Sequence, residues 1–360
     1  MPLDSGCPPH DAAAMLHVLF CSSRATPLQL SRAARDTPAA MSDRLATPLA
    51  PGVFQLDLRF QGFAGAVAAF LIADGDTLTL IETGPGSTLP TLRAAIAEAG
   101  FAVEALTHVV VTHIHLDHAG AAGTLLREAP RARFHVHPVG APHLIDPSKL
   151  LASATRIYGA DMDRLWGAFD AVPADRLTTL GDGDAISLRG GRRLVAWHTP
   201  GHAIHHVALH DSATNDLYTG DVAGVRLGHA PHVRPPTPPP DVDLDAWRAS
   251  IARLRALAPS RLLLTHFGAV DDVAWHLDDL LSRLFHWAGW IEGRLEPPDA
   301  DTATIIADLR TRGAREIERA LRETDGDMAL LDTLVRGYEL ATPSHMTVGG
   351  IARWMKKKSR

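Results

Sequence analysis

Residues 112–120 read Thr-His-Ile-His-Leu-Asp-His-Ala-Gly, so three imidazoles and one carboxylate lie between His113 and His118. The segment follows a β-branched run at 108–112 that is typical of a short strand. Side chains at alternate positions of an extended segment point the same way, so we expect His113, His115 and Asp117 to project together, with His118 turned aside as a helix begins. Neutral imidazole and carboxylate suit zinc, iron or manganese, and the segment therefore predicts a metal site.

Three later residues could complete such a site, because each follows a predicted strand. His202 ends the turn His-Thr-Pro-Gly-His after the strand 193–198. Asp221 follows Tyr-Thr-Gly, and His266 follows an apolar run at 262–264. A single histidine or aspartate of this kind is usually a core or surface residue, but three of them at strand ends, in this order, favour ligands.

The order His-x-His-x-Asp-His, His, Asp, His resembles the metallo-β-lactamase-fold hydrolases over about 52–268. The resemblance implies an αββα sandwich, with a first metal on His113, His115 and His202. It implies a second metal on Asp117, His118 and His266, with Asp221 bridging the two. Some zinc β-lactamases have cysteine at the position of Asp221. With a carboxylate there, this sequence is more similar to the glyoxalase II and lactonase branch of the family. The family's early Asp is Glu82 here, which leaves the hydrogen-bond geometry of that residue open.

The resemblance also implies a function. We expect two divalent metal ions, zinc first with iron or manganese as alternatives, and a metal-bridging hydroxide that attacks an ester, lactone or thioester of a small organic substrate. Asp117 and Asp221 are the expected catalytic carboxylates. One alternative is an iron-dependent persulfide dioxygenase, which would need only part of this ligand set. Another is a ribonuclease Z-like phosphodiesterase.

The periodicity beyond the motifs predicts an α/β protein in three parts. Residues 1–45 are expected to be a disordered extension, and a protein that begins at Met41 is expected to keep its fold and activity. Residues 46–268 are expected to form the αββα domain. Residues 139–175 look like a helical insertion in that domain, and 269–360 a helical C-terminal region. Within the latter we expect separate helices at 302–311 and 314–323. Tyr158 and Trp166 of the insertion, with the Pro-rich loop 230–240, are expected to cap a substrate pocket.

Composition limits the partners. The net charge is −6, and the only basic cluster is the terminal 356–360, which argues against nucleic acid. The sequence has no apolar run long enough to cross a membrane, and its two cysteines, Cys7 and Cys21, lie far from the candidate ligands. We therefore expect a cytoplasmic enzyme with a small-molecule substrate and no membrane partner, and leave a homodimer open.

Overall fold

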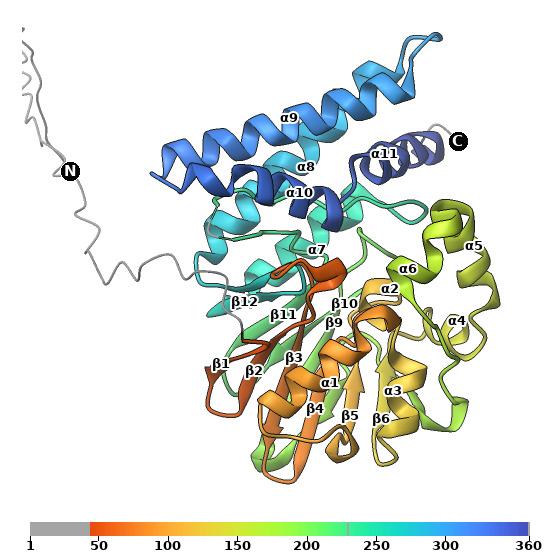
Figure 1. The fold of residues 1–360 in the computed structure, drawn as a ribbon, viewed down its shortest axis with the longest axis vertical. Helices are drawn as coiled ribbons and strands as arrows, with labels where there is room; N and C mark the ends of the chain where they lie inside the picture. Colours follow the sequence, from red (N-terminus) through yellow and green to blue (C-terminus); the bar gives the residue numbers. More distant parts are fainter. Residues whose placement is uncertain (1–43, 229, 359–360) are drawn as a thin grey trace, which may run out of the picture. The chain divides into compact units, whose positions relative to one another are not determined.

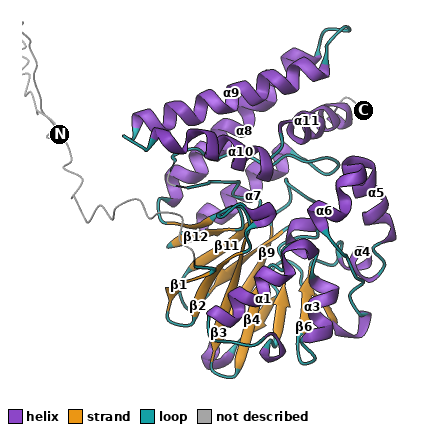
Figure 2. Ribbon diagram, in the orientation of Figure 1, coloured by secondary structure: helices purple, strands orange, loops and turns teal. Residues whose placement is uncertain are grey.

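Two β-sheets packed face to face, with helices outside them, form the body of the protein (Figures 1 and 2). The structure is a computed structural model, and it describes residues 44–228 and 230–358. One sheet has seven strands in the order β1 to β7, and the other has six in the order β13-β12-β11-β10-β9-β8. The expected αββα sandwich is confirmed.

The first sheet changes from antiparallel to parallel half-way across. Strands β1 to β4 pair antiparallel and β4 to β7 pair parallel. The strands are β1 (Ala46–Ala50), β2 (Val53–Asp57), β3 (Ala68–Asp74), β4 (Thr77–Ile81), β5 (His108–Val110), β6 (Arg133–Val136) and β7 (Leu177–Thr179). The predicted turn at Asp74-Gly75-Asp76 joins β3 to β4. Because β4 and β5 are parallel, the segments that follow them leave the sheet at the same edge.

The second sheet sends its own loops to that edge. Its strands are β8 (Ala185–Ser187), β9 (Arg193–His198), β10 (Val207–Asp211), β11 (Asp216–Gly220), β12 (Arg261–Leu264) and β13 (Gly268–Val270). Strands β11 and β12 are parallel, while β9 and β11 both pair antiparallel with β10 and so run in one direction. The turns after β9, β11 and β12 therefore emerge together.

Eleven α-helices of the described residues cover the sheets or extend beyond them. The helices of the first layer and the insertion are α1 (Leu89–Glu98), α2 (Leu116–Ala119), α3 (Ala122–Glu128), α4 (Ala141–Ile145), α5 (Ser148–Tyr158) and α6 (Met162–Trp166). Those that follow the second sheet's strands are α7 (Leu244–Ala256), α8 (Val273–Leu295), α9 (Thr302–Glu323), α10 (Leu331–Ala341) and α11 (Ser344–Lys358). In Figure 1 the blue C-terminal helices lie above the sandwich, and α11 faces the insertion helices α5 and α6.

The core between the sheets is apolar. Phe70 and Ile81 from the first sheet meet Tyr218 and Leu263 from the second, all of them buried. The rings of Phe70 and Tyr218 pack edge to face, with their centroids 5.2 Å apart. This contact fixes how the two sheets face each other, and with them the loops at the shared edge.

One expectation about the elements was wrong, and four strands were missed. The two helices expected at 302–311 and 314–323 are the single helix α9. The helix continues through Gly313. A Cβ at this position would come within 2.4 Å of the Arg234 guanidinium, so the glycine allows Arg234 to pack closely against α9. The strands β1, β2, β7 and β13 were not predicted.

The expected N-terminal extension lies almost wholly outside the described residues, of which Arg44 is the first. The Leu45 backbone N–H donates to Glu98 in α1 (3.0 Å), and β1 begins at the next residue. Leu45, the last residue of the expected extension, therefore already contacts the sandwich, whose first strand starts at Ala46.

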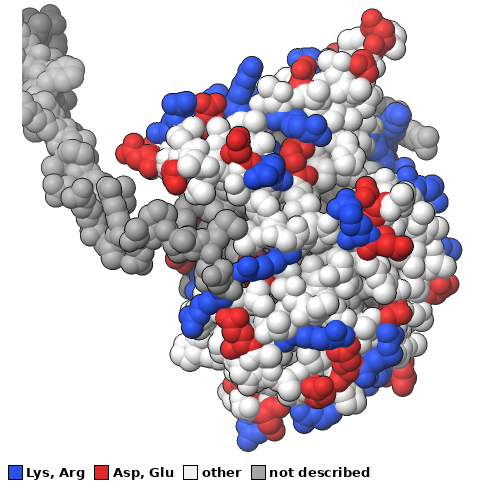
Figure 3. Space-filling model, in the orientation of Figure 1, with Lys and Arg blue, Asp and Glu red and all other residues white. Residues whose placement is uncertain are grey.

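The surface and the helices give two further observations. Figure 3 shows Lys and Arg interspersed with Asp and Glu over the visible face of the described residues. None of the helices described is both long enough and apolar enough to span a bilayer.

His276 in α8 makes folding sensitive to acid. It is fully buried, its Nε2 donates to the Ala223 carbonyl (2.8 Å), and burial lowers its pKa to about 4. The unfolded chain keeps a histidine pKa near 6.5, so between these values it binds more protons than the folded protein. Stability is therefore lost as pH falls from about 6.5 to 4, by about 3 kcal/mol for this residue.

The measurement is urea unfolding at pH 7 and at pH 4.5. His276→Gln keeps an N–H donor for Ala223 but cannot be protonated, so it should lose less stability on acidification than the parent. Equal losses in the two proteins would contradict the assignment.

Candidate metal centre

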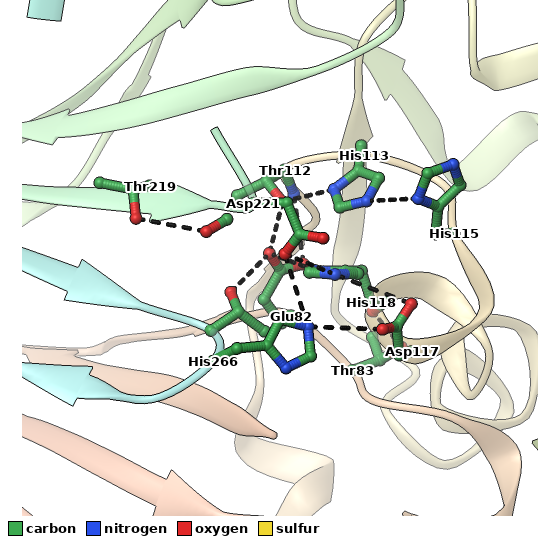
Figure 4. A network of polar contacts seen from close by, with 12 residues as sticks. Glu82, Thr83, Thr112, His113, His115, Asp117, His118, Thr219, Asp221 and His266 are labelled. Carbon is green, nitrogen blue, oxygen red and sulfur yellow. Dashed lines mark hydrogen bonds and ion pairs between the residues drawn. The ribbon is translucent and has the colours of Figure 1, made fainter. Parts of the chain in front are cut away.

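All seven residues expected as ligands meet at the edge where the strands of both sheets end. Figure 4 labels six of them, all except His202. His113 and His115 lie between β5 and α2, and Asp117 and His118 lie in the first turns of α2. The other three follow β9, β11 and β12: His202, Asp221 and His266. Strand ends in two different sheets thus supply one polar cluster.

The expected projection of the first motif was wrong. The extended segment ends at Val110 and α2 starts at Leu116, so the alternation does not reach Asp117. His118 is not turned aside: its ring lies 3.9 Å from that of His113. Ligand atoms within 4.8 Å of one another fall into three groups. The groups are His113, His115 and His202; His113, His118 and Asp221; and Asp117, His118 and His266.

The first group is three converging imidazoles. The Nδ1 atom of His115 lies 2.9 Å from Nε2 of His113 and 2.9 Å from Nε2 of His202. Burial lowers the pKa of His113 far below its usual range and that of His115 to about 3, so both rings are neutral. Neutral rings whose nitrogens face one point offer lone pairs to a cation.

The group of Asp117, His118 and His266 adds a carboxylate. Asp117 lies 3.4 Å from His266 Nε2 and 3.7 Å from His118 Nε2. Burial alone would lower the pKa of His118, but the charges of Asp117, Glu82 and Asp221 outweigh burial and raise it. A divalent cation would compensate the same negative charge.

Asp221 faces both of the groups just described. Its Oδ2 lies 3.4 Å from His202 Nε2, while its Oδ1 lies 3.3 Å from His118 Nε2 and 3.4 Å from His266 Nε2. Burial tends to raise the pKa of this carboxyl, but His118, His202 and His266 hold it far below its usual range. An ionised carboxylate with one oxygen toward each group has the geometry of a bridge.

The outward nitrogens of these rings are already engaged, which tests whether the residues fit metal ions. Nδ1 of His202 contacts the Pro236 carbonyl (2.8 Å), and Nδ1 of His266 contacts the Ala66 carbonyl (2.7 Å). A carbonyl can only accept, so in the neutral ring Nδ1 carries the proton and Nε2 keeps its lone pair. Nε2 of His118, Nε2 of His266 and Oδ1 of Asp221 are buried without a hydrogen-bond partner. These residues fit divalent metal ions.

Glu82 lies among the candidate ligands and contacts several of the side chains around it (Figure 4). It is fully buried, and its carboxylate contacts His118 Nδ1 (3.1 Å), the Thr112 hydroxyl (2.5 Å) and the Thr265 hydroxyl (3.3 Å). The residue has a φ of +66°, a strained backbone conformation for a side chain of this size. The extra methylene relative to aspartate therefore does not prevent contact with a candidate ligand.

One other histidine contacts the candidate ligands through the backbone. His206 Nε2 accepts from the Asp221 backbone N–H (3.2 Å), and its Nδ1 meets the Thr199 hydroxyl (2.8 Å). Sequence reasoning missed the carbonyls of Pro236 and Ala66, because a backbone acceptor has no residue type that reveals it. His135, by contrast, pairs with His108 and is in none of the three ligand groups.

The profile of one known family matches residues 62–266, more than half of the chain, and that family is the metallo-β-lactamase superfamily. The chain belongs to this superfamily. Among curated relatives, it is 29% identical over 224 residues to the metallo-beta-lactamase fold-containing protein ST1585 of Sulfurisphaera tokodaii. That match covers 60% of this chain and 80% of the relative.

A second relative is more distant, and one solved structure extends the comparison of the fold. The atrochrysone carboxyl ACP thioesterase of Aspergillus fumigatus is 25% identical over 212 residues, 58% of this chain and 39% of the thioesterase. The structure of the metallo-beta-lactamase family protein TTHA1429 from Thermus thermophilus superposes with a TM-score of 0.63 at 19% identity. It covers 87% of this chain and 95% of that one. This last likeness concerns the fold alone.

Replacing Asp221 tests the bridge. Asp221→Ala should lower the metal content of the purified protein and its affinity for a second ion, because both groups lose a shared anionic ligand. The measurement is metal analysis after dialysis against defined zinc. Asp216→Asn, a change at the buried first residue of β11, the strand that Asp221 follows, is the control and should keep full metal content. A fully loaded Asp221→Ala protein would contradict the assignment.

Proposed function

We propose that this protein is a dinuclear metal-dependent hydrolase that cleaves an ester, lactone or thioester of a small organic substrate. The observation that carries the proposal is the orientation of Asp221, whose two oxygens face two separate groups of histidines. The branch of the superfamily that contains glyoxalase II and lactonases remains our interpretation. The distant thioesterase relative supports the same class of reaction.

Two divalent ions held by these residues would supply an acidified water molecule and polarise a carbonyl oxygen. Asp117 lines the adjoining pocket. Burial tends to raise its pKa, but His118 and His266 lower it to about 2. It is therefore ionised at neutral pH, and its free lone pairs can accept a hydrogen bond that orients the attacking water.

A pocket of about 390 Å³ opens directly onto the candidate ligands His115, Asp117, His202 and Asp221. Ile157 and Tyr158 from α5 and Trp166 from α6 line it, as does the proline run 238–240. The ring of Trp166 stacks on Phe60 (5.5 Å) and meets Tyr158 edge to face (5.0 Å), so this wall is well packed. These contacts support the predicted cap and suit an apolar acyl group.

The charge of the pocket restricts that acyl group further. None of the described residues that line it is Lys or Arg, and Asp161 and Glu339, which also line it, are each paired with an arginine outside the lining. At the wall formed by α5, α6 and the proline run, away from the candidate metal ligands, a carboxylate on the acyl part would lose its hydration without gaining a cationic side chain, which is unfavourable. The proposed substrate therefore carries an uncharged acyl group.

Paired substrates test this charge rule. The metal-loaded protein should hydrolyse a neutral acyl ester or thioester at least about tenfold faster, in kcat/KM, than the analogue that ends in a carboxylate. Ser153→Arg places a cation in the wall and should narrow the ratio. Ala152→Arg, exposed on the same helix α5, is the matched control and should leave the ratio unchanged.

The outcomes separate two failures. If the ratio does not favour the neutral substrate, the charge rule is wrong. If the fully metal-loaded protein turns over no ester, lactone or thioester of a panel with varied acyl chains, the proposed hydrolase function is wrong.

A further inference from the structure

The loop 222–243 links the candidate bridge Asp221 to α7 and carries the carbonyl that orients a candidate ligand. The Pro236 carbonyl lies 2.8 Å from His202 Nδ1, on the side of the ring away from the other ligands. The contact that a ligand histidine makes through its second nitrogen fixes the orientation of the ring. The position of Pro236 therefore determines where His202 Nε2 points.

Arg234, two residues earlier, anchors this part of the loop. Its backbone exchanges two hydrogen bonds of 2.9 Å with Val225. Its side chain is 1% exposed and enters the C-terminal helices, where Nη1 donates to Glu339 of α10 (2.8 Å). The guanidinium lies over the rings of Trp287 (5.3 Å) and Tyr338 (5.1 Å). A buried charge held this way has one favourable position.

The C-terminal helices are built around that guanidinium. Gly313 of α9 leaves it room, because a Cβ there would lie 2.4 Å from Nη2. Glu339 also accepts from the Ser344 hydroxyl (2.7 Å), which fixes the start of α11. Farther along α11, Gly350 packs so closely on the loop that a Cβ would lie 1.9 Å from the Thr237 carbonyl oxygen. The loop is thus held on both sides of Pro236.

We propose that Arg234 and Glu339 are positioning residues for His202: through Pro236, they make the C-terminal helices part of the metal centre. The inference rests on the proposed function, because it takes His202 as a metal ligand. It extends that function to helices outside the matched segment 62–266.

The loop has other anchors, which makes the role of Arg234 separable from folding. The Tyr338 hydroxyl donates to the His232 carbonyl (2.6 Å), and Arg283 donates to the Val233 carbonyl (2.8 Å). Both contacts lie on the far side of Arg234 from Pro236. Loss of the Arg234 side chain would leave these contacts, the backbone pairing with Val225 and the packing at Thr237 in place, and would remove only the side-chain anchor on the Arg234 side of Pro236.

The test compares metal affinity in Arg234→Met, Arg234→Lys and the parent protein, by competition with a chromogenic zinc chelator. We expect Arg234→Met to weaken one of the two zinc-binding steps by about 10- to 100-fold, the range typical for the loss of a ligand's orienting partner. Arg234→Lys keeps the charge toward Glu339 and should recover part of the affinity. Arg261→Met removes another largely buried arginine, paired with Asp216 at 2.7 Å, and should leave zinc affinity unchanged.

Gly313→Ala is the second variant, because it displaces the guanidinium without removing its charge and decides the case if Arg234→Met does not fold. For Gly313→Ala we expect a smaller loss of zinc affinity than for Arg234→Met, in the same binding step. Unchanged zinc affinity in the folded variants overturns this inference. If His202→Ala itself leaves zinc binding unchanged, it is the proposed function that fails.

Discussion

Five imidazoles and two carboxylates are packed at the edge of an apolar sandwich, and burying so many polar groups is unfavourable unless each has a partner. The outward atoms of the rings find theirs in the protein: Pro236 for His202, Ala66 for His266 and Glu82 for His118. The inward atoms face one another across gaps of 3.3–3.7 Å between nitrogen and oxygen. The outward atoms therefore have protein partners, whereas the inward atoms lack them. Cations in the centre would supply the missing partners of the inward atoms.

This difference between outward and inward atoms explains why distant elements matter to the site. A ring can present one nitrogen inward only while something holds the other, so every holding group becomes part of the centre. For His202 that group is a backbone carbonyl in a loop, and the loop takes its position from α10 and α11. Those helices also supply a wall of the pocket, through residues such as Leu340 and Met346. Metal geometry and acyl selection therefore depend on the same helical region.

The sequence predicted those features of the fold and the site that depend on residue type. It did not predict those that depend on the course of the backbone. The hairpin β3–β4 and the position of each candidate ligand at a strand end followed from residue types. The direction of Asp117 did not, because α2 begins at Leu116 and ends the two-residue alternation. The continuity of α9 across 312–313 was missed too, because Arg234, the residue for which Gly313 makes room, lies 79 positions (313 − 234) earlier in the chain. The Pro236 carbonyl has no residue signature at all.

Anomalous diffraction from crystals grown with zinc, recorded on both sides of the zinc absorption edge, tests the dinuclear centre most directly. We expect two peaks about 3.5–4 Å apart. One should lie among His113, His115 and His202, the other among Asp117, His118 and His266, with one Asp221 oxygen toward each. A single peak in zinc-saturated crystals, or two peaks with Asp221 turned away from either, would contradict the dinuclear assignment.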